Sequence, residues 1–140
     1  MSMKITLCHS VSFMDYARRL TKELKEKGHE VLTAPYTERS TEDLEKMLSD
    51  RENYINNMKP KFIREHFDNI LSSDSVLVIN LDKNGIKNYI GGSTFAEIMF
   101  AFYNKKKIFI LNTLPEKSMF MDELKAIKPI ILNKNLDMIK

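Results

Sequence analysis

The chain has one cysteine, four glycines, four prolines and no tryptophan in 140 residues. The single cysteine, Cys8, excludes an internal disulfide framework and is typical of a reducing compartment, so we expect a cytoplasmic protein. No apolar run reaches the roughly 20 residues that cross a bilayer, and no signal peptide is visible, so we expect no membrane contact. The formal net charge is only +3, and the lysines at 105–107 fit a solvated loop before a strand. This charge predicts no nucleic-acid partner.

The few glycines and histidines exclude two further kinds of site. Gly85, Gly91 and Gly92 match neither the GxGxxG motif nor the P-loop, so binding of a dinucleotide or ATP by those motifs lacks support. No second histidine and no further cysteine lies at metal-ligand spacing from His9 or Cys8. We therefore expect no metal site and no organic cofactor.

The remaining composition is that of an ordinary globular protein, with 43% hydrophobic and 29% charged residues. Residues 1–140 suit a single domain with a substantial core. Short apolar runs predict strands, and apolar residues at helical spacing between them predict helices. The expected strands are 3–8, 30–33, 75–80, 107–111 and 129–132. The expected helices are 15–27, 40–57, 62–71, 94–103 and 119–126, the first ended by Gly28 and the second followed by a break at Pro60.

This alternation of strands and helices predicts a three-layer α/β sandwich with a five-stranded parallel sheet, flavodoxin-like or Rossmann-like in outline. Pro129 indicates that the last strand lies at an edge. Such sheets bind ligands at the carboxyl ends of their strands, near the point where the strand order reverses. We expect the functional residues in the loops that meet there, which are 8–13, 33–39, 80–94 and 111–118.

The stretch Asn88–Glu97 joins the central strand to an unusually apolar helix and combines a Gly-Gly turn, two hydroxyls and an acid. Glu97 allows two interpretations. With Thr94 it has the spacing of a capping box, in which the glutamate accepts from the N-cap N–H. It could instead be a carboxylate nucleophile, which needs a second acid or an aromatic hydroxyl nearby. Asp68, late in the preceding helix, is the candidate second acid, although a solvated surface aspartate fits the same position.

His9 and Ser10 directly follow the first strand, where a backbone turn can contact phosphate or a sugar hydroxyl. His9 titrates near neutral pH and could serve as acid or base, or lie unused at the surface. Cys8, at the end of a buried strand, is more typical of the core than of a nucleophile.

The run GGSTFAEIMFAF at 91–102, followed by KKKIFILN at 105–112, resembles the nucleoside 2-deoxyribosyltransferase-like family, which includes the 2′-deoxynucleoside 5′-phosphate N-hydrolases. The resemblance also covers the first strand and the segment 67–78. It implies that Glu97 is the nucleophile and that Asp68 holds the sugar or handles the leaving-group proton. It further implies a substrate-binding set of Cys8, His9, Ser10, Gly91, Gly92 and Ser93.

The resemblance implies an enzyme that cleaves or transfers at the N-glycosidic bond of a nucleoside or nucleotide through a glutamate nucleophile. The alternative is a non-catalytic module that binds a nucleotide or a nucleotide sugar. Thr6, where the family often has a tyrosine, and Gly91, where many transferases have an aspartate, favour this alternative. The apolar helix ending at Tyr103 is either fully buried or shared with a second subunit, so we expect a homodimer or a higher homo-oligomer.

Overall fold

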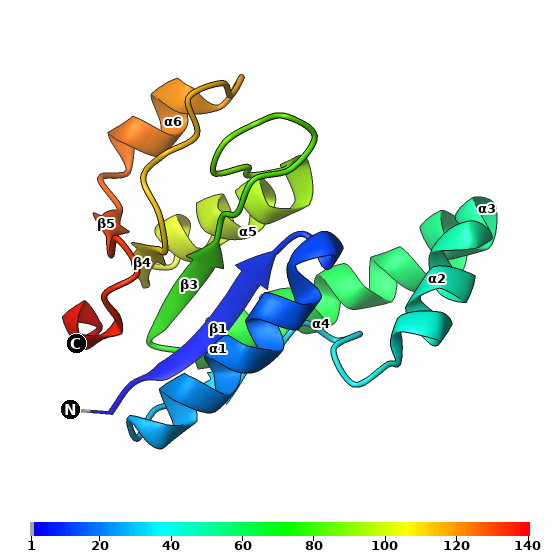
Figure 1. Ribbon diagram of the computed structural model, residues 1–140, viewed down its shortest axis with the longest axis horizontal. Helices are drawn as coiled ribbons and strands as arrows, with labels where there is room; N and C mark the ends of the chain where they lie inside the picture. Colours follow the sequence, from blue (N-terminus) through cyan, green and yellow to red (C-terminus); the bar gives the residue numbers. More distant parts are fainter. Residues whose placement is uncertain (1) are drawn as a thin grey trace.

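The protein, seen in a computed structural model that describes residues 2–140, is built on a single five-stranded sheet (Figure 1). Its strands are Lys4–His9 (β1), Glu30–Leu32 (β2), Ser75–Ile79 (β3), Lys107–Ile110 (β4) and Ile130–Ile131 (β5). All neighbouring strands pair in parallel, in the order β2-β1-β3-β4-β5. This is the flavodoxin-like order, so the predicted fold class is confirmed. The strand β5 lies at an edge, as Pro129 indicated.

Helices cover both faces of the sheet and build two separate cores. On one face, Ile5 and Leu7 of β1 pack with the first helix and the C-terminal turn. On the other face, Cys8 of β1 lies in a core shared with three later helices, Lys59–Ser72, Gly92–Tyr103 and Met121–Ala126. The helices are α1 (Met14–Glu26), α2 (Thr41–Ser49), α3 (Arg51–Asn53), α4 (Lys59–Ser72), α5 (Gly92–Tyr103) and α6 (Met121–Ala126), with shorter turns η1 (Val11–Phe13), η2 (Tyr54–Met58) and η3 (Leu136–Met138).

Helix α1 ends where the sequence predicted. Gly28 has a φ of 93°, in the left-handed region that residues with a Cβ rarely adopt. Its N–H donates to the Lys25 carbonyl, and the His29 N–H donates to the Leu24 carbonyl. This Schellman arrangement pairs two of the carbonyls that a helix end leaves free and turns the chain into β2.

The segment before β3 differs from the predicted single helix over 40–57 with a break at Pro60. Helix α2 ends at Ser49, and the Asp50 carboxylate caps α3 by accepting from the Asn53 N–H at 3.2 Å. From α3 the chain continues through the π-helical turn η2 directly into α4. Pro60 lies in the first turn of α4, a position that suits its fixed φ and missing N–H, so it starts this helix instead of breaking it.

The helices α2 and α3 extend beyond the sheet at the amino-terminal end of α4 (Figure 1). Leu44 and Tyr54 form a third, smaller core with Met14 of α1. Tyr36 and Phe62 pack against this core, with their ring centroids 5.7 Å apart. Since α4 runs antiparallel to the strands, this core lies near the carboxyl ends of the strands and adds an aromatic wall there.

Helix α5 is less enclosed than its apolar composition suggests. Ile98 and Ala101 are fully buried, but Phe102 and Tyr103 are 49% and 83% exposed. Complete burial of this helix within one chain was one of two predicted alternatives and is wrong. The other alternative, a second subunit, stays a prediction. Within residues 2–140, no helix combines the length and the hydropathy needed to cross a bilayer.

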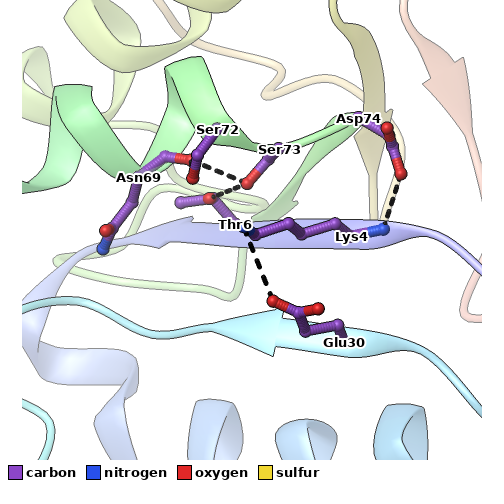
Figure 2. A network of polar contacts seen from close by, with 7 residues as sticks. All are labelled: Lys4, Thr6, Glu30, Asn69, Ser72, Ser73 and Asp74. Atoms are coloured by element: carbon purple, nitrogen blue, oxygen red, sulfur yellow. Dashed lines mark hydrogen bonds and ion pairs between the residues drawn. The ribbon is translucent and has the colours of Figure 1, made fainter.

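A polar network ties together the amino-terminal edge of the sheet (Figure 2). The Lys4 N–H donates to Asp74 Oδ2 at 2.8 Å. Thr6, which is fully buried, shares a 2.6 Å hydrogen bond with the Ser73 hydroxyl. Ser73 donates its own proton to the Asn69 carbonyl at 2.7 Å, so it accepts from Thr6. These contacts hold β1 against the α4–β3 turn, at the edge opposite the predicted functional loops.

We expect Ser73→Ala to lower the free energy of unfolding by about 1–3 kcal/mol, because it leaves the buried Thr6 hydroxyl without its partner. Ser72→Ala is the matched control. The Ser72 hydroxyl donates to the same Asn69 carbonyl, but its side chain is exposed. Its loss should therefore cost less than about 0.5 kcal/mol. Urea unfolding of both variants measures the difference, and equal losses would show that the Thr6–Ser73 bond contributes nothing.

Candidate active site

A cavity of ≈ 470 Å³ opens at the carboxyl edge of the sheet, beside β1 and β3, where the strand order reverses. This volume lies within the ~300–1,000 Å³ that small-molecule sites occupy. Three of the four predicted loops contribute residues to it, namely 8–13, 33–39 and 80–94. None of the described residues 111–118 lines it. The remaining walls come from α2, α3, η2, α4 and, through Glu97, α5.

Most of the predicted site residues meet in this cavity. Six of them line it: His9, Ser10, Gly91, Gly92, Ser93 and Glu97. His9 is the last residue of β1 and not, as predicted, the first residue of a loop. Cys8 is fully buried behind the cavity wall and does not line it. Asp68 is exposed on α4 and does not reach the cavity.

Glu97 is not a capping residue. Helix α5 begins at Gly92 with Gly91 as its N-cap, so Thr94 and Glu97 both lie inside the helix. The capping-box interpretation is therefore wrong. The Glu97 side chain is only 14% exposed, and its Oε2 lies 3.4 Å from His66 Nδ1.

His66 on α4 occupies the position next to Glu97 that Asp68 was expected to fill. Phe62, His66 and Ile70 follow one another at i, i+4 spacing and so share the face of α4 that packs inward. Asp68 lies two residues further along the helix than His66, which turns it toward solvent. This spacing is visible in the sequence and places His66 on the apolar side of the helix, but it does not show which residue reaches Glu97.

Burial sets the protonation of this pair. It raises the pKa of Glu97 to about 8, and the nearby Cys8 thiol and Lys59 ammonium lower that pKa only in part. Burial, reinforced by His9, lowers the pKa of His66 to about 4. Although the 3.4 Å contact has the geometry of an ion pair, both shifts favour the neutral forms. At neutral pH the proton therefore resides mainly on Glu97, and the His66 ring beside it is neutral.

Cys8 contacts this pair from the interior side. Its Sγ lies 3.7 Å from His66 Nε2. Burial, together with the neighbouring Glu97 carboxyl, raises the pKa of the Cys8 thiol. Cys8 is therefore a protonated core residue in the free protein, as its position in a buried strand predicted.

His9 offers the cavity a hydrogen-bond acceptor. Its Nδ1 lies 2.8 Å from the Ser10 carbonyl oxygen, which can only accept, so Nδ1 carries the proton. The other ring nitrogen, Nε2, is buried and has no hydrogen-bond partner among residues 2–140. Burial also lowers the pKa of His9, which keeps the ring neutral. The unpaired Nε2 can accept from a hydroxyl of a bound molecule.

Positive charge surrounds the cavity. Lys83 donates to Ser10 Oγ at 2.9 Å and lies over the Tyr89 ring, 5.2 Å from its centroid. Arg51 and Lys59 also line the cavity. Among the described residues, Glu97 is the only acid that lines the cavity. The sequence marked the loop at 80–94 as functional, but nothing in it indicated that these three cations converge.

Buried amides hold the loop that carries Lys83 and Tyr89. Asn80 is fully buried, and its Oδ1 accepts from the Asn112 N–H at 2.9 Å. Asn88 donates from Nδ2 to Thr113 Oγ1, also at 2.9 Å. These bonds tie both ends of the loop to the segment after β4. That segment thus supports the cavity without lining it.

Gly91 makes room for the Tyr89 ring. A Cβ at Gly91 would lie 2.8 Å from the Tyr89 hydroxyl oxygen and 3.2 Å from Cε1. At Gly92 a Cβ would meet nothing within 4 Å. The first glycine therefore lets an aromatic side chain pack on the backbone at the helix start, while the second is free of that constraint.

Among the solved structures that resemble this chain are two enzymes. The structure of the Clostridium botulinum CMP N-glycosidase BcmB matches with a TM-score of 0.50 and 20% sequence identity, over 94% of this chain and 90% of that chain. A 2-deoxyribosyltransferase from the psychrotolerant bacterium Bacillus psychrosaccharolyticus matches with a TM-score of 0.57 and 16% identity, over 84% of this chain and 78% of that chain. No protein-family model and no curated protein sequence matches it. At these identities the likeness shows a shared fold, and this is the fold that the family resemblance implied.

Replacing each of the two glycines by alanine should change the stability of the protein in opposite directions. We expect Gly91→Ala to destabilise the protein by about 1–2 kcal/mol, because the Tyr89 ring must leave its packed position. We expect Gly92→Ala to stabilise it by about 0.4–1 kcal/mol, because Gly92 is the first helical residue and a Cβ there restricts only the unfolded chain. Scanning calorimetry of both variants tests this. A gain in melting temperature for Gly91→Ala would contradict the packing assigned to Tyr89.

Proposed function

We propose that this chain hydrolyses the N-glycosidic bond of a nucleoside monophosphate, with Glu97 as nucleophile, and that it belongs to the nucleoside 2-deoxyribosyltransferase-like family. The observation that carries this proposal is the buried carboxyl of Glu97 beside a neutral imidazole, in a cavity at the carboxyl edge of the sheet. The names of the two structural neighbours, a nucleotide N-glycosidase and a deoxyribosyltransferase, support it.

The charge of the cavity favours a nucleotide over an uncharged nucleoside. Lys83 and Ser10 form one polar contact at the rim, next to the exposed first residues of α5, Gly92 and Ser93. Free N–H groups at a helix start and a lysine beside them are suited to bind a phosphate. With Glu97 protonated, Lys83, Arg51 and Lys59 leave the cavity with a net positive charge.

In the proposed reaction, Glu97 passes its proton to His66 Nδ1 and its carboxylate attacks C1′ of the sugar. The bond between C1′ and the base nitrogen breaks, its electron pair stays on the base, and the base takes the proton from His66. Water then attacks C1′, the bond from C1′ to Glu97 breaks, and the proton of the water returns to the carboxylate. This is the two-step route of retaining glycosidases. A free base in place of water gives transfer instead of hydrolysis.

The second candidate is a non-catalytic module that binds a nucleotide. The observation that favours it is the position of Thr6, which bonds to Ser73 at the opposite sheet edge and brings no hydroxyl to Glu97. Tyr36, whose side chain lines the cavity, is the aromatic hydroxyl available near Glu97 instead. The two candidates predict the same ligand and differ only in turnover.

Release of free base from nucleoside monophosphates, followed by chromatography, tests the proposal. We expect Glu97→Gln to lower turnover by about 10³-fold or more, because the amide cannot form the glycosyl intermediate. His66→Ala should also lower turnover, whereas Asp68→Asn should retain it within about 2-fold, since surface substitutions away from a site have small effects. Loss of turnover in Asp68→Asn would restore the assignment made from the sequence. Nucleotide binding without base release would favour the non-catalytic module.

Lys83→Met should reduce kcat/KM for a nucleoside monophosphate by about 10- to 100-fold, because a hydrogen bond to a charged group contributes ~1.5–3 kcal/mol. It should change kcat/KM for the corresponding nucleoside much less. Lys87→Met is the matched control, since Lys87 lies in the same loop, is exposed and does not line the cavity. An equal loss for both substrates would show that Lys83 does not contact the phosphate.

A further inference from the structure

Three side chains of different elements converge at the base of the cavity, and the proposed reaction uses only two of them. Cys8 of β1, His66 of α4 and Glu97 of α5 each offer one ligand atom, and these atoms all lie within 4.8 Å of one another. We infer that Cys8, His66 and Glu97 form a binding site for a divalent transition-metal ion of the zinc type, and that the ion blocks the cavity by holding Glu97.

The distances suit one ion. Zinc bonds to thiolate, imidazole and carboxylate ligands at about 2.0–2.3 Å, which places neighbouring ligands of a tetrahedral site about 3.5 Å apart. One ligand atom from each of the three residues lies within 4.8 Å of the other two, which is close to this spacing. Cys8 Sγ is 3.7 Å from His66 Nε2, and Glu97 Oε2 is 3.4 Å from the other ring nitrogen, Nδ1. A single ion uses one of the two His66 nitrogens, so the ligands draw together by about 1 Å around it.

The types of ligand select the metal. A thiolate and an imidazole are soft or borderline donors that favour Zn²⁺ or Co²⁺. Mg²⁺ and Ca²⁺ prefer oxygen ligands, of which this group supplies a single carboxylate. Binding displaces the protons of the Cys8 thiol and the Glu97 carboxyl to solvent, as metal binding to such groups does generally.

The burial of the three ligands determines how an ion reaches the site and which residues it then blocks. Cys8 and His66 are 0% and 4% exposed, whereas Glu97 and His66 line the cavity. An ion therefore enters through the cavity, and its fourth coordination position faces the cavity. A bound ion occupies both the proposed nucleophile and its proton acceptor. The site was not predicted because its ligands come from three separate elements and not from one short motif.

Cobalt titration of the metal-stripped protein tests the site without any substrate. We expect one equivalent of Co²⁺ to bind and to give the near-ultraviolet charge-transfer band of a cobalt–thiolate bond, which Zn²⁺ then removes. Cys8→Ser should abolish the band, and Glu97→Gln should weaken binding at least 10-fold by calorimetry. His29→Gln is the matched control, because His29 is similarly buried but lies near the amino terminus of β2. It should leave binding unchanged.

Binding of Co²⁺ without the thiolate band, or with an affinity that Glu97→Gln leaves unchanged, would overturn the inference. If Cys8→Ser does not fold, as judged by circular dichroism, the Glu97→Gln arm still decides. The result is independent of the proposed function, because metal binding is measured directly. If base release is also observed, one equivalent of Zn²⁺ should inhibit it and a chelator should restore it.

Discussion

The burial of one carboxyl group against one imidazole is the constraint on which the site depends. Glu97 is placed inside α5, beyond the helix start, where its own backbone cannot supply hydrogen bonds. Taking a carboxylate out of water is costly unless it is protonated or paired, and here the neutral contact with His66 meets that requirement. This unfavourable burial occurs at a position that faces a cavity. Titratable residues with shifted pKa values in such positions are typical of functional sites. A carboxyl group that contributed only to stability could lie at the surface without this desolvation cost.

The parallel sheet explains how the group is assembled. Since β1 and β3 are neighbours and run in the same direction, the residues that follow them reach the same edge. Helix α4 runs back along the sheet and brings His66 to that edge from the opposite direction, while α5 leaves it with Glu97 in its second turn. The polar network around Thr6 and Ser73 fixes the other edge (Figure 2). One edge is thus closed by hydrogen bonds between its own residues, and the other opens into a polar cavity.

The charges around the cavity complement its buried core. The neutral pair contributes little field, so the lysines and Arg51 determine which ligands are attracted. Lys83 is held in place by a loop whose ends are fastened through Asn80 and Asn88. Glu97 and His66, together with Cys8, offer the donor atoms of a transition-metal site. A single location therefore combines cationic side chains at its rim with a buried carboxyl, imidazole and thiol at its base.

The sequence by itself determined the fold class and the order of the strands, because hydrophobic periodicity is a local property of the chain. The positions of His9, Ser10 and the Gly91–Ser93 turn after predicted strands indicated that they lie at the cavity, and the family resemblance added Glu97. It could not decide between His66 and Asp68, or between a cap and a buried acid at Glu97. Those choices depend on how far α4 and α5 are rotated and where α5 begins, and both are set by packing of distant residues such as Ile70 and Ile98. The convergence of Cys8 with this pair, and of Lys83 with Ser10, was likewise decided only by the tertiary structure, because no local pattern records contacts between segments so far apart in the chain.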